Sequence, residues 1–530
     1  MTTKERRWVW IYGIALALVC SLPYVVGFAQ AGSNWQFSGF VFGVEDGNSY
    51  IAKMLAGSNG EWLFRTPYTT MEQRGELVFL PYLLLGKLAA SPALHLQLVL
   101  LFHLFRFAVT PFTVFAIYRF STLFLKDLAW RRWVTILATV GGGLGWTLPL
   151  FGRTDFMGSM PLDFISPETF GFLAFLGLPH LVLARGLMLM AIQSYLEAGR
   201  DGTRSWYSGL LLLLLTLVQS LSTLSVYAVL LLHQTLLLLD GAAQSRKRWW
   251  QTWMPAALRT VLPSMPLILY YIYRFSRDPF LQAWTQQNQI PSPHPIHYLL
   301  AYGALLIPVL FTLSKKPWRD QPLWLLPVGW VIALPLLAYF PHNLQRRLVE
   351  GIWVAMLIVA AYGLQHWGAQ WRLKSAIRGT LSLTGLISAA MLFIGSTQVV
   401  SDPAPPVFVS LEQTKAFQWM ADYVTPGSVV LAEYATSNVL PAWAPIFVPI
   451  GHGPESVGLD DLKPQVDAVY GSSLSSEARF SWLQRERIDY VFYGESERLV
   501  GTWDPDQDSF LTNVYQSESI VIYEVDRAED

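Results

Sequence analysis

The chain has 530 residues, of which 53% are hydrophobic and only 14% are charged. Soluble domains usually carry about 25% charged residues, so this composition excludes an ordinary soluble protein. The net charge is zero, yet residues 401–530 hold 21 Asp and Glu against 7 Lys and Arg, whereas the remainder holds 16 against 30. The two parts therefore carry −14 and +14 and suit different surroundings. A single cysteine, Cys20, excludes an internal disulfide.

Apolar stretches recur along the first 400 residues. A membrane-spanning helix needs about 20 mostly apolar residues. Eleven candidates cover residues 8–28, 94–120, 133–151, 170–196, 206–220, 221–239, 254–275, 296–313, 323–340, 348–366 and 379–399. The sequence therefore predicts a polytopic α-helical membrane domain over residues 1–400, with about eleven spans. Ala29-Gln30-Ala31 also fits a signal-peptidase site, but the apolar run before it is longer than a signal peptide has, which favours an uncleaved first helix.

Short loops rich in Lys and Arg predict the topology, because such loops usually face the cytoplasm. The N-terminus and loops 126–132, 200–204, 246–248, 315–319 and 372–378 are basic. They share one side if residues 76–90 form an interfacial or re-entrant helix. We therefore predict a cytoplasmic N-terminus and outside loops 29–77, 152–169, 276–295 and 341–347. The predicted location is the cytoplasmic (inner) membrane of a bacterium, since outside segments without cysteines fit that origin.

A short proline-rich linker at Pro403, Pro405 and Pro406 precedes a segment of different character. Apolar spacing predicts helices over residues 412–423 and 476–487, and β-rich runs predict strands over 428–433, 490–493 and 519–525. Residues 401–530 are therefore predicted to form a soluble, extracytoplasmic α/β domain. The segment shows no zinc-ligand spacing, phosphate-binding glycine loop or nucleophile elbow.

The first outside loop holds the leading candidates for catalysis. Glu45 and Asp46 follow the first span and precede a short helix that contains Tyr50 and Lys53. A carboxylate in apolar surroundings can act as a general base toward an incoming hydroxyl group. Asp46 and Glu45 are the predicted catalytic residues, and Tyr50 and Lys53 are predicted to bind substrate. The alternative is a solvated loop in which Asp46 caps the helix.

Two further sets of residues are candidates for ligand binding. Asp155 and Asp163, in the second outside loop, could join Asp46 around a divalent cation such as Mg²⁺ or Mn²⁺, which takes oxygen ligands; each alone can equally be a solvated charge. His180 lies within an apolar stretch, where a titratable group is costly to bury, so we predict that it binds substrate. The alternative is a hydrogen-bonded packing histidine.

Gln345, Arg346 and Arg347 follow His342 at the predicted outer face, against the tendency of basic residues to lie inside. Guanidinium groups match phosphate oxygens in a bidentate geometry. We predict that one of the two arginines binds a lipid phosphate or pyrophosphate, and that Gln345, Arg346 and Arg347 all bind substrate. The alternative is an interfacial salt bridge or a snorkelling contact. The amide-rich loop 278–288 has a composition suited to sugar hydroxyl groups.

With these residues, the chain resembles the GT-C superfamily of membrane glycosyltransferases, most closely its bacterial branches of uncharacterised activity. The resemblance covers the whole chain in architecture. It implies that Asp46, with Glu45, is the catalytic or acceptor-binding carboxylate. It also implies that Asp155, or alternatively Asp163, is the second acidic position and that Arg346 and Arg347 hold the donor's polyprenyl phosphate. The chain departs from the family by lacking a paired-acid motif after the third span and an oligosaccharyltransferase-type acceptor motif.

The predicted function is therefore an inverting glycosyltransferase that uses a polyprenyl-phosphate-linked sugar at the outer face of the membrane. Its acceptor would be a glycan, a lipid or a protein, and its other partner the bilayer; no nucleic acid is expected. The alternative is a non-enzymatic membrane protein, such as a subunit for lipid or polysaccharide translocation or a scaffold. A third hypothesis gives the acidic C-terminal domain the main role, as a sensor or binding module.

Overall fold

The computed structural model describes residues 1–239, 246–368 and 371–526, so the last four residues of the predicted domain 401–530 lie outside it. The chain divides into two compact units. The helical unit comprises Met1–Leu22, Leu104–Tyr273 and Gln289–Gly395. The α/β unit comprises Pro23–His103, Arg274–Asn288 and Ser396–Asp530. The C-terminal segment therefore folds in one unit with the whole of the first predicted outside loop.

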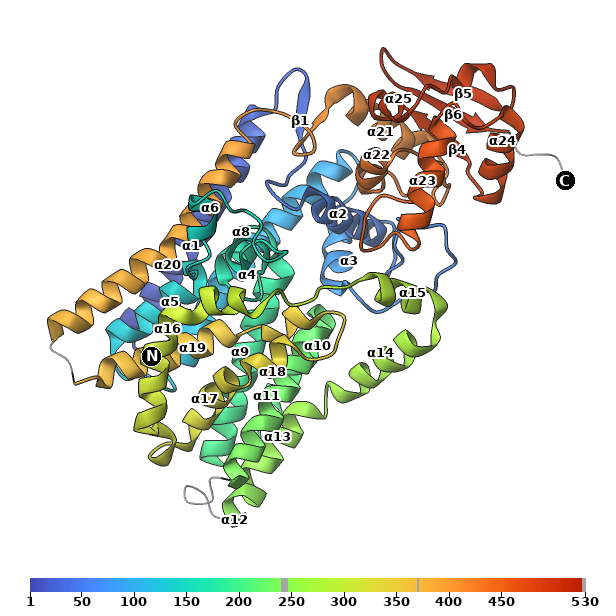
Figure 1. The fold of residues 1–530 in the computed structure, drawn as a ribbon. Helices are drawn as coiled ribbons and strands as arrows, with labels where there is room; N and C mark the ends of the chain where they lie inside the picture. Colours follow the sequence, from blue (N-terminus) through green and yellow to red (C-terminus); the bar gives the residue numbers. More distant parts are fainter. Residues whose placement is uncertain (240–245, 369–370, 527–530) are drawn as a thin grey trace. The chain divides into compact units, whose positions relative to one another are not determined.

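Among the residues that the structure describes, seven helical stretches are long and apolar enough to cross a membrane. Six of the seven predicted spans that they match are built on single helices: α1 (Thr3–Gln30), α4 (Leu94–Ser121), α9 (Pro179–Asp201), α11 (Ser220–Leu239), α16 (Pro295–Lys315) and α20 (Trp371–Val399). The seventh is α19 (Ile352–His366) with the preceding 3-10 helix η4 (Gln345–Val349). α20 is the long orange helix in Figure 1.

The remaining predicted spans form short helices, and the predicted span 170–196 is interrupted before α9. Gly141 ends α5 (Leu128–Val140), and Leu178 separates α8 (Gly171–Gly177) from α9 just before Pro179. Proline lacks the backbone N–H that a helix interior needs, and glycine is a weak helix former. The remaining short helices of this part are α6 (Thr147–Leu150), α7 (Leu162–Ile165), α10 (Tyr207–Val218), α12 (Arg246–Arg248), α13 (Met254–Val261), α14 (Met265–Arg277), α17 (Leu325–Ile332) and α18 (Leu334–Ala338).

Close backbone approach and one buried ion pair hold the helical unit together. A Cβ atom at Gly363 of α19 would stand 2.1 Å from the carbonyl oxygen of Pro308 in α16, so only glycine fits there. Arg185 of α9 pairs with Glu350 at 2.6 Å, and both side chains are almost fully buried. Small residues and satisfied polar groups are what helices use to associate where lipid surrounds them.

A four-stranded sheet organises the C-terminal segment in the order β3-β4-β6-β5. Its strands are β3 (Val430–Leu431), β4 (Tyr490–Tyr493), β5 (Leu511–Gln516) and β6 (Val521–Val525), and Figure 1 shows the last three in red. β3 and β4 are parallel, whereas the other two pairs are antiparallel. The predicted strand 490–493 is confirmed, the predicted strands 428–433 and 519–525 are shorter, and β5 was not predicted.

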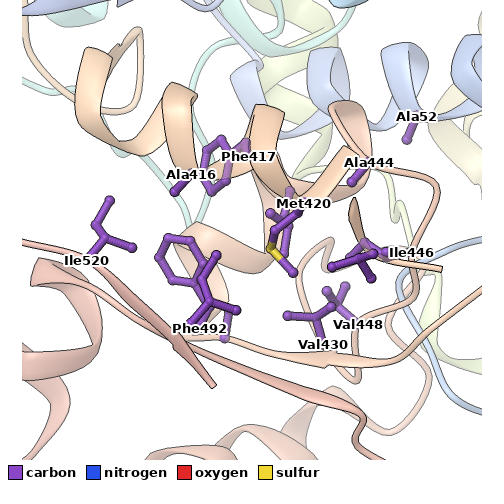
Figure 2. Packing of buried hydrophobic residues seen from close by; sticks show 14 of the residues in the cluster. Ala52, Ala416, Phe417, Met420, Val430, Ala444, Ile446, Val448, Phe492 and Ile520 are labelled. Carbon is purple, nitrogen blue, oxygen red and sulfur yellow. The ribbon is translucent and has the colours of Figure 1, made fainter. Parts of the chain in front are cut away.

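Each face of this sheet carries its own hydrophobic core, because side chains alternate along a strand. Phe492 and Ile522 face the first core, which α21 (Leu411–Tyr423) covers with Phe417 and Met420. Figure 2 shows Phe417, Met420 and Phe492 of this core, together with Ala52 of the first outside loop, which belongs to the same cluster. The second core contains Val491 and Tyr523, and is covered by α23 (Leu459–Tyr470) and α24 (Ser476–Arg485). The predicted helices 412–423 and 476–487 are confirmed.

The first outside loop is integrated into the same α/β unit. Its strand β1 (Trp35–Phe37) pairs antiparallel with β2 (Phe408–Ser410). Its helix α2 (Val44–Ser58) packs closely on α3 (Leu80–Gly86), since a Cβ atom at Gly57 would stand 2.0 Å from the carbonyl oxygen of Leu83. α3 is the short helix within the predicted interfacial segment 76–90. The unit also contains α15 (Pro279–Gln287), α22 (Tyr434–Val439) and α25 (Glu495–Val500).

Candidate functional site

The first turn of α2 presents the two predicted catalytic carboxylates. Gly43 adopts the left-handed conformation (φ 53°) that turns the chain into this helix. Glu45 and Asp46 follow in the first turn, where the partial positive charge of a helix N-terminus favours acidic side chains. The Asp46 side chain is 52% exposed. Glu45 is also exposed, and its Oε2 accepts a hydrogen bond from the Tyr434 hydroxyl at 3.1 Å.

His452, from the C-terminal segment, lies against Asp46. Its Nε2 is 3.0 Å from Asp46 Oδ1, and its Nδ1 is 3.4 Å from Glu455 Oε1. Burial by itself would lower the pKa of His452, but the contacts with the Asp46 and Glu455 carboxylates outweigh it and raise the pKa to about 9. The imidazole is therefore protonated at neutral pH and donates its Nε2–H to Asp46.

Glu455 stands at the centre of a buried polar cluster. Its Oε1 accepts hydrogen bonds from Lys53 Nζ at 2.6 Å and Ser49 Oγ at 2.9 Å, and its Oε2 accepts one from Thr66 Oγ1 at 2.6 Å. Burial alone would raise the pKa of Glu455, but the Lys53 and His452 charges hold it well below its usual range. We call the group of Asp46, His452, Glu455 and Lys53 the Asp46 network.

One face of α2 carries the polar residues that contact Glu455, and a neighbouring face packs on α3. Ser49 and Lys53 lie one turn apart and therefore share a face. The Lys53 ammonium group is also 4.5 Å from the centre of the Phe79 ring, a cation–π contact. Tyr50 stacks on Tyr82 of α3 with ring centres 4.7 Å apart. The Lys53 side chain is 1% exposed, and its ammonium group bonds to Glu455 and Ser49, so Lys53 is a buried structural member of the site. Substrate binding by Tyr50 and Lys53 remains a prediction.

The helical unit holds the predicted phosphate-binding arginines in the 3-10 helix η4, not in an α-helix. The Nε atoms of Arg346 and Arg347 are buried and lack a hydrogen-bond partner among the described residues. Arg347 Nε lies 3.6 Å from Glu168 Oε1, which is an ion pair but not a close hydrogen bond. The side chain of Gln345 accepts a hydrogen bond from the Ser292 backbone N–H at 3.1 Å. The guanidinium groups therefore retain hydrogen-bonding capacity inside the protein.

The other predicted site residues of the helical unit have separate surroundings. Asp155 is exposed. Asp163 is buried, which raises its pKa, and its Oδ1 accepts hydrogen bonds from the Gly143 N–H at 2.8 Å and the Ser388 hydroxyl at 2.6 Å. His180 is buried in α9. Over the described parts of the chain, no group of three or more His, Cys, Asp or Glu side chains is placed to hold a metal ion. Metal binding by Asp46, Asp155 and Asp163 remains a prediction without a preformed ligand cluster.

Two members of the Asp46 network, His452 and Glu455, were not singled out from the sequence. They lie in Gly451-His452-Gly453-Pro454-Glu455, a turn-forming stretch with two titratable side chains three residues apart. That local composition is the one signal that could have found them. Their partners Asp46 and Lys53 are about 400 residues away in the chain.

Comparison with known proteins gives no match to a family model and none to a curated protein sequence. Solved structures do match. The archaeal oligosaccharyltransferase AglB from Archaeoglobus fulgidus, in complex with an inhibitory peptide and a dolichol-phosphate, has a TM-score of 0.56 at 11% identity; the match covers 93% of this chain and 70% of AglB. The arabinofuranosyltransferase AftD from Mycobacteria has a TM-score of 0.54 at 12% identity, covering 99% of this chain and 40% of AftD.

This chain shares the fold of these two glycosyltransferases. The fold class predicted from the sequence is thereby confirmed: a multi-pass helical membrane protein with a small α/β part near its C-terminus. Another structure of the Archaeoglobus fulgidus enzyme, at TM-score 0.53 and 12% identity, is a complex with Zn and sulfate.

Replacing Glu455 with Gln tests how strongly the buried ion pair stabilises the α/β unit. Lys53 would then be left buried without a counter-charge, which typically costs about 3–5 kcal/mol. We expect this loss in the free energy of unfolding, measured by denaturant titration with tryptophan fluorescence in lipid nanodiscs. The double variant Lys53→Met/Glu455→Leu should recover most of it, and the exposed Glu477→Gln should change little. An unchanged midpoint for Glu455→Gln would show that the pair contributes nothing.

The protonation of His452 can be followed directly by histidine-selective NMR. Because its pKa in the folded protein is about 9, above the usual 6.5, its protonation stabilises the folded state fully below pH 6.5, and this stabilisation disappears as the pH rises through 9. We expect a ring signal that titrates near pH 9 and disappears in His452→Gln. In Asp46→Asn the midpoint should fall. A midpoint near 6.5 in the unmodified protein would contradict the assigned ion pairs.

Proposed function

We propose that this protein is a membrane glycosyltransferase that moves a sugar from a polyprenyl-phosphate donor to an acceptor hydroxyl group at the outer face of the cytoplasmic membrane. The observation that carries the proposal is the Asp46 network: a half-exposed carboxylate held by a protonated histidine, on a chain that shares the fold of the two glycosyltransferases. A lipid-linked donor explains why the enzyme would have many apolar helices, because the tail of the donor stays in the bilayer.

In the proposed reaction, Asp46 accepts the proton of the acceptor hydroxyl group. The acceptor oxygen forms a bond to C1 of the sugar while the bond between C1 and the phosphate oxygen breaks. The bonding electron pair leaves with the polyprenyl phosphate, and attack from the opposite side inverts the configuration at C1. His452 fixes the Asp46 carboxylate through the 3.0 Å hydrogen bond and so reduces the reorganisation that proton transfer needs. The acceptor is a glycan, a lipid or a protein.

Arg346 and Arg347 are proposed to bind the donor phosphate within the helical unit. Their buried Nε atoms, without hydrogen-bond partners among the described residues, would gain partners from phosphate oxygens. Gln345 lies beside them in η4. Asp46, Asp155 and Asp163 stay proposed ligands for a divalent cation, Mg²⁺ or Mn²⁺. No step above depends on that ion.

Asp46→Asn tests the proposed base. The amide keeps the size of the side chain but cannot accept the proton, and loss of a general base typically lowers the rate by about 10²–10⁴-fold. We expect that loss in a transfer assay on purified protein in lipid, with a panel of radiolabelled polyprenyl-phosphate sugars and membrane glycan acceptors. Asp422→Asn, on the exposed face of α21 in the same unit, is the matched control and should keep full activity. If Asp46→Asn is as active as the unmodified protein, Asp46 is not the base. If the unmodified protein binds a donor but transfers sugar with no donor and acceptor of the panel, the non-enzymatic alternative is favoured.

Arg346→Gln tests the phosphate site without requiring turnover. Losing one charged hydrogen-bond donor group typically costs about 1.5–3 kcal/mol, so we expect binding of polyprenyl phosphate to weaken at least about tenfold. Binding can be measured in nanodiscs by titration with a short-chain polyprenyl phosphate. Arg153→Gln, an exposed arginine of the same unit, should leave the affinity unchanged. Equal affinities for both variants would assign Arg346 to packing.

A further inference from the structure

The loop 451–458, which carries His452 and Glu455, is bonded through Glu455 to α2 and Thr66, and it is also bonded to the end of α15. Gln287, the last residue of α15, donates hydrogen bonds from Nε2 to the carbonyl oxygens of Gly453 at 2.6 Å and Ser456 at 2.7 Å. Its Oε1 accepts a third from the Gly458 N–H at 3.1 Å. The neighbouring Asn288 donates to the carbonyl oxygen of Pro454 at 2.8 Å. One side-chain amide therefore bridges three points of the loop.

The loop also contains internal hydrogen bonds, made by Ser456, the residue next to Glu455. The Ser456 hydroxyl oxygen accepts hydrogen bonds from the backbone N–H groups of Gly451 at 2.9 Å and His452 at 3.0 Å. This closure fixes the ends of the turn relative to each other, but it gives the turn no anchor on another element. Gly458, at φ 75°, needs the left-handed conformation that glycine adopts without cost, and three glycines in eight residues make the free loop easy to distort. Gln287 adds a second anchor, on α15, to the one that Glu455 makes with Lys53, Ser49 and Thr66.

The segment that supplies Gln287 is itself firmly placed in the α/β unit. Arg274 forms ion pairs with Glu76 and Asp278. Asp278 caps α15 by accepting a hydrogen bond from the Leu281 N–H at 3.2 Å. The side chains of Phe280 and Leu281, on the packed face of α15, are buried. α15 is therefore capped at its start and packed along one face, and Gln287, an exposed residue at its end, reaches the loop.

We propose that Gln287 is a positioning residue, which keeps the 451–458 loop in the conformation that places the His452 imidazole against the Asp46 carboxylate. The inference rests on the proposed function for its effect on catalysis, but the contact it describes can be measured without turnover. Without this anchor the loop samples other conformations, His452 Nε2 leaves Asp46 Oδ1 for part of the time, and fewer molecules present an oriented base. Substrate binding is not changed, because Gln287 acts through the loop.

Gln287→Glu is the sharpest test, because it preserves size and shape but replaces the Nε2 donor with an oxygen. Two hydrogen bonds to carbonyl oxygens then become repulsive contacts. Gln282→Glu is the matched control, because Gln282 lies on the same helix, is exposed and undergoes the same change of charge. Among the described residues its amide donates only to the Ser276 carbonyl oxygen, at 2.7 Å. Gln287→Ala separates loss of the anchor from the added charge.

Two measurements decide the outcome for the full-length protein in nanodiscs. Hydrogen–deuterium exchange of the peptide that spans residues 451–458 should accelerate by about tenfold in Gln287→Glu and Gln287→Ala, as expected for two or three lost hydrogen bonds, and not in Gln282→Glu. In the transfer assay, kcat should fall at least about tenfold while KM for the donor stays within about twofold.

Unchanged exchange in both Gln287 variants would overturn the proposal, whatever the enzyme does. A raised KM with unchanged kcat would also overturn it, because Gln287 would then contact substrate directly. If the unmodified protein transfers no sugar at all, the proposed function fails, and the exchange measurement still decides whether Gln287 anchors the loop.

Discussion

The Lys53 ammonium group and the Glu455 carboxylate lie 402 residues apart in the sequence and 2.6 Å apart in the folded protein, and both are almost completely buried. Neither charge can be buried alone without a large free-energy cost, so each requires the other. Their pairing draws α2 against the loop that carries His452, and Ser49 and Thr66 satisfy the remaining oxygen positions of Glu455. The exposed end of the Asp46 network depends on this buried pair, because His452 touches both Asp46 and Glu455.

Buried charged side chains of the helical unit differ in how fully they are paired. Arg185 and Glu350 pair with each other at 2.6 Å, and such a satisfied pair can serve structure alone. Arg346 and Arg347 have buried Nε atoms without hydrogen-bond partners among the described residues. A buried charged group without a full set of hydrogen-bond partners costs free energy, and phosphate oxygens can supply the missing partners. The phosphate-binding role proposed for the arginines follows from this difference.

The α/β unit joins three distant pieces of the chain around one reactive carboxylate. α2 provides Asp46, the C-terminal segment provides His452 and Glu455, and α15 anchors the loop between them through Gln287. A half-exposed side chain supported by buried neighbours can be both reactive and well oriented, which catalytic sites need. Asp46 and Gln287 lie on helices, whereas His452 and Glu455 lie in a short loop.

The sequence by itself determined the membrane class, the α/β character of the C-terminal segment and the candidate carboxylates Glu45 and Asp46, because hydropathy, strand alternation and charge are local properties. It also predicted the spans that became single long helices, but not the breaks at Gly141 and Leu178, where proline and glycine end helices inside apolar runs. Only the tertiary structure decided that Lys53 is buried beneath the site, that His452 and Glu455 belong to it, and that Gln287 holds their loop. Those contacts join residues more than 160 positions apart, and no local pattern specifies which buried charge will meet which partner.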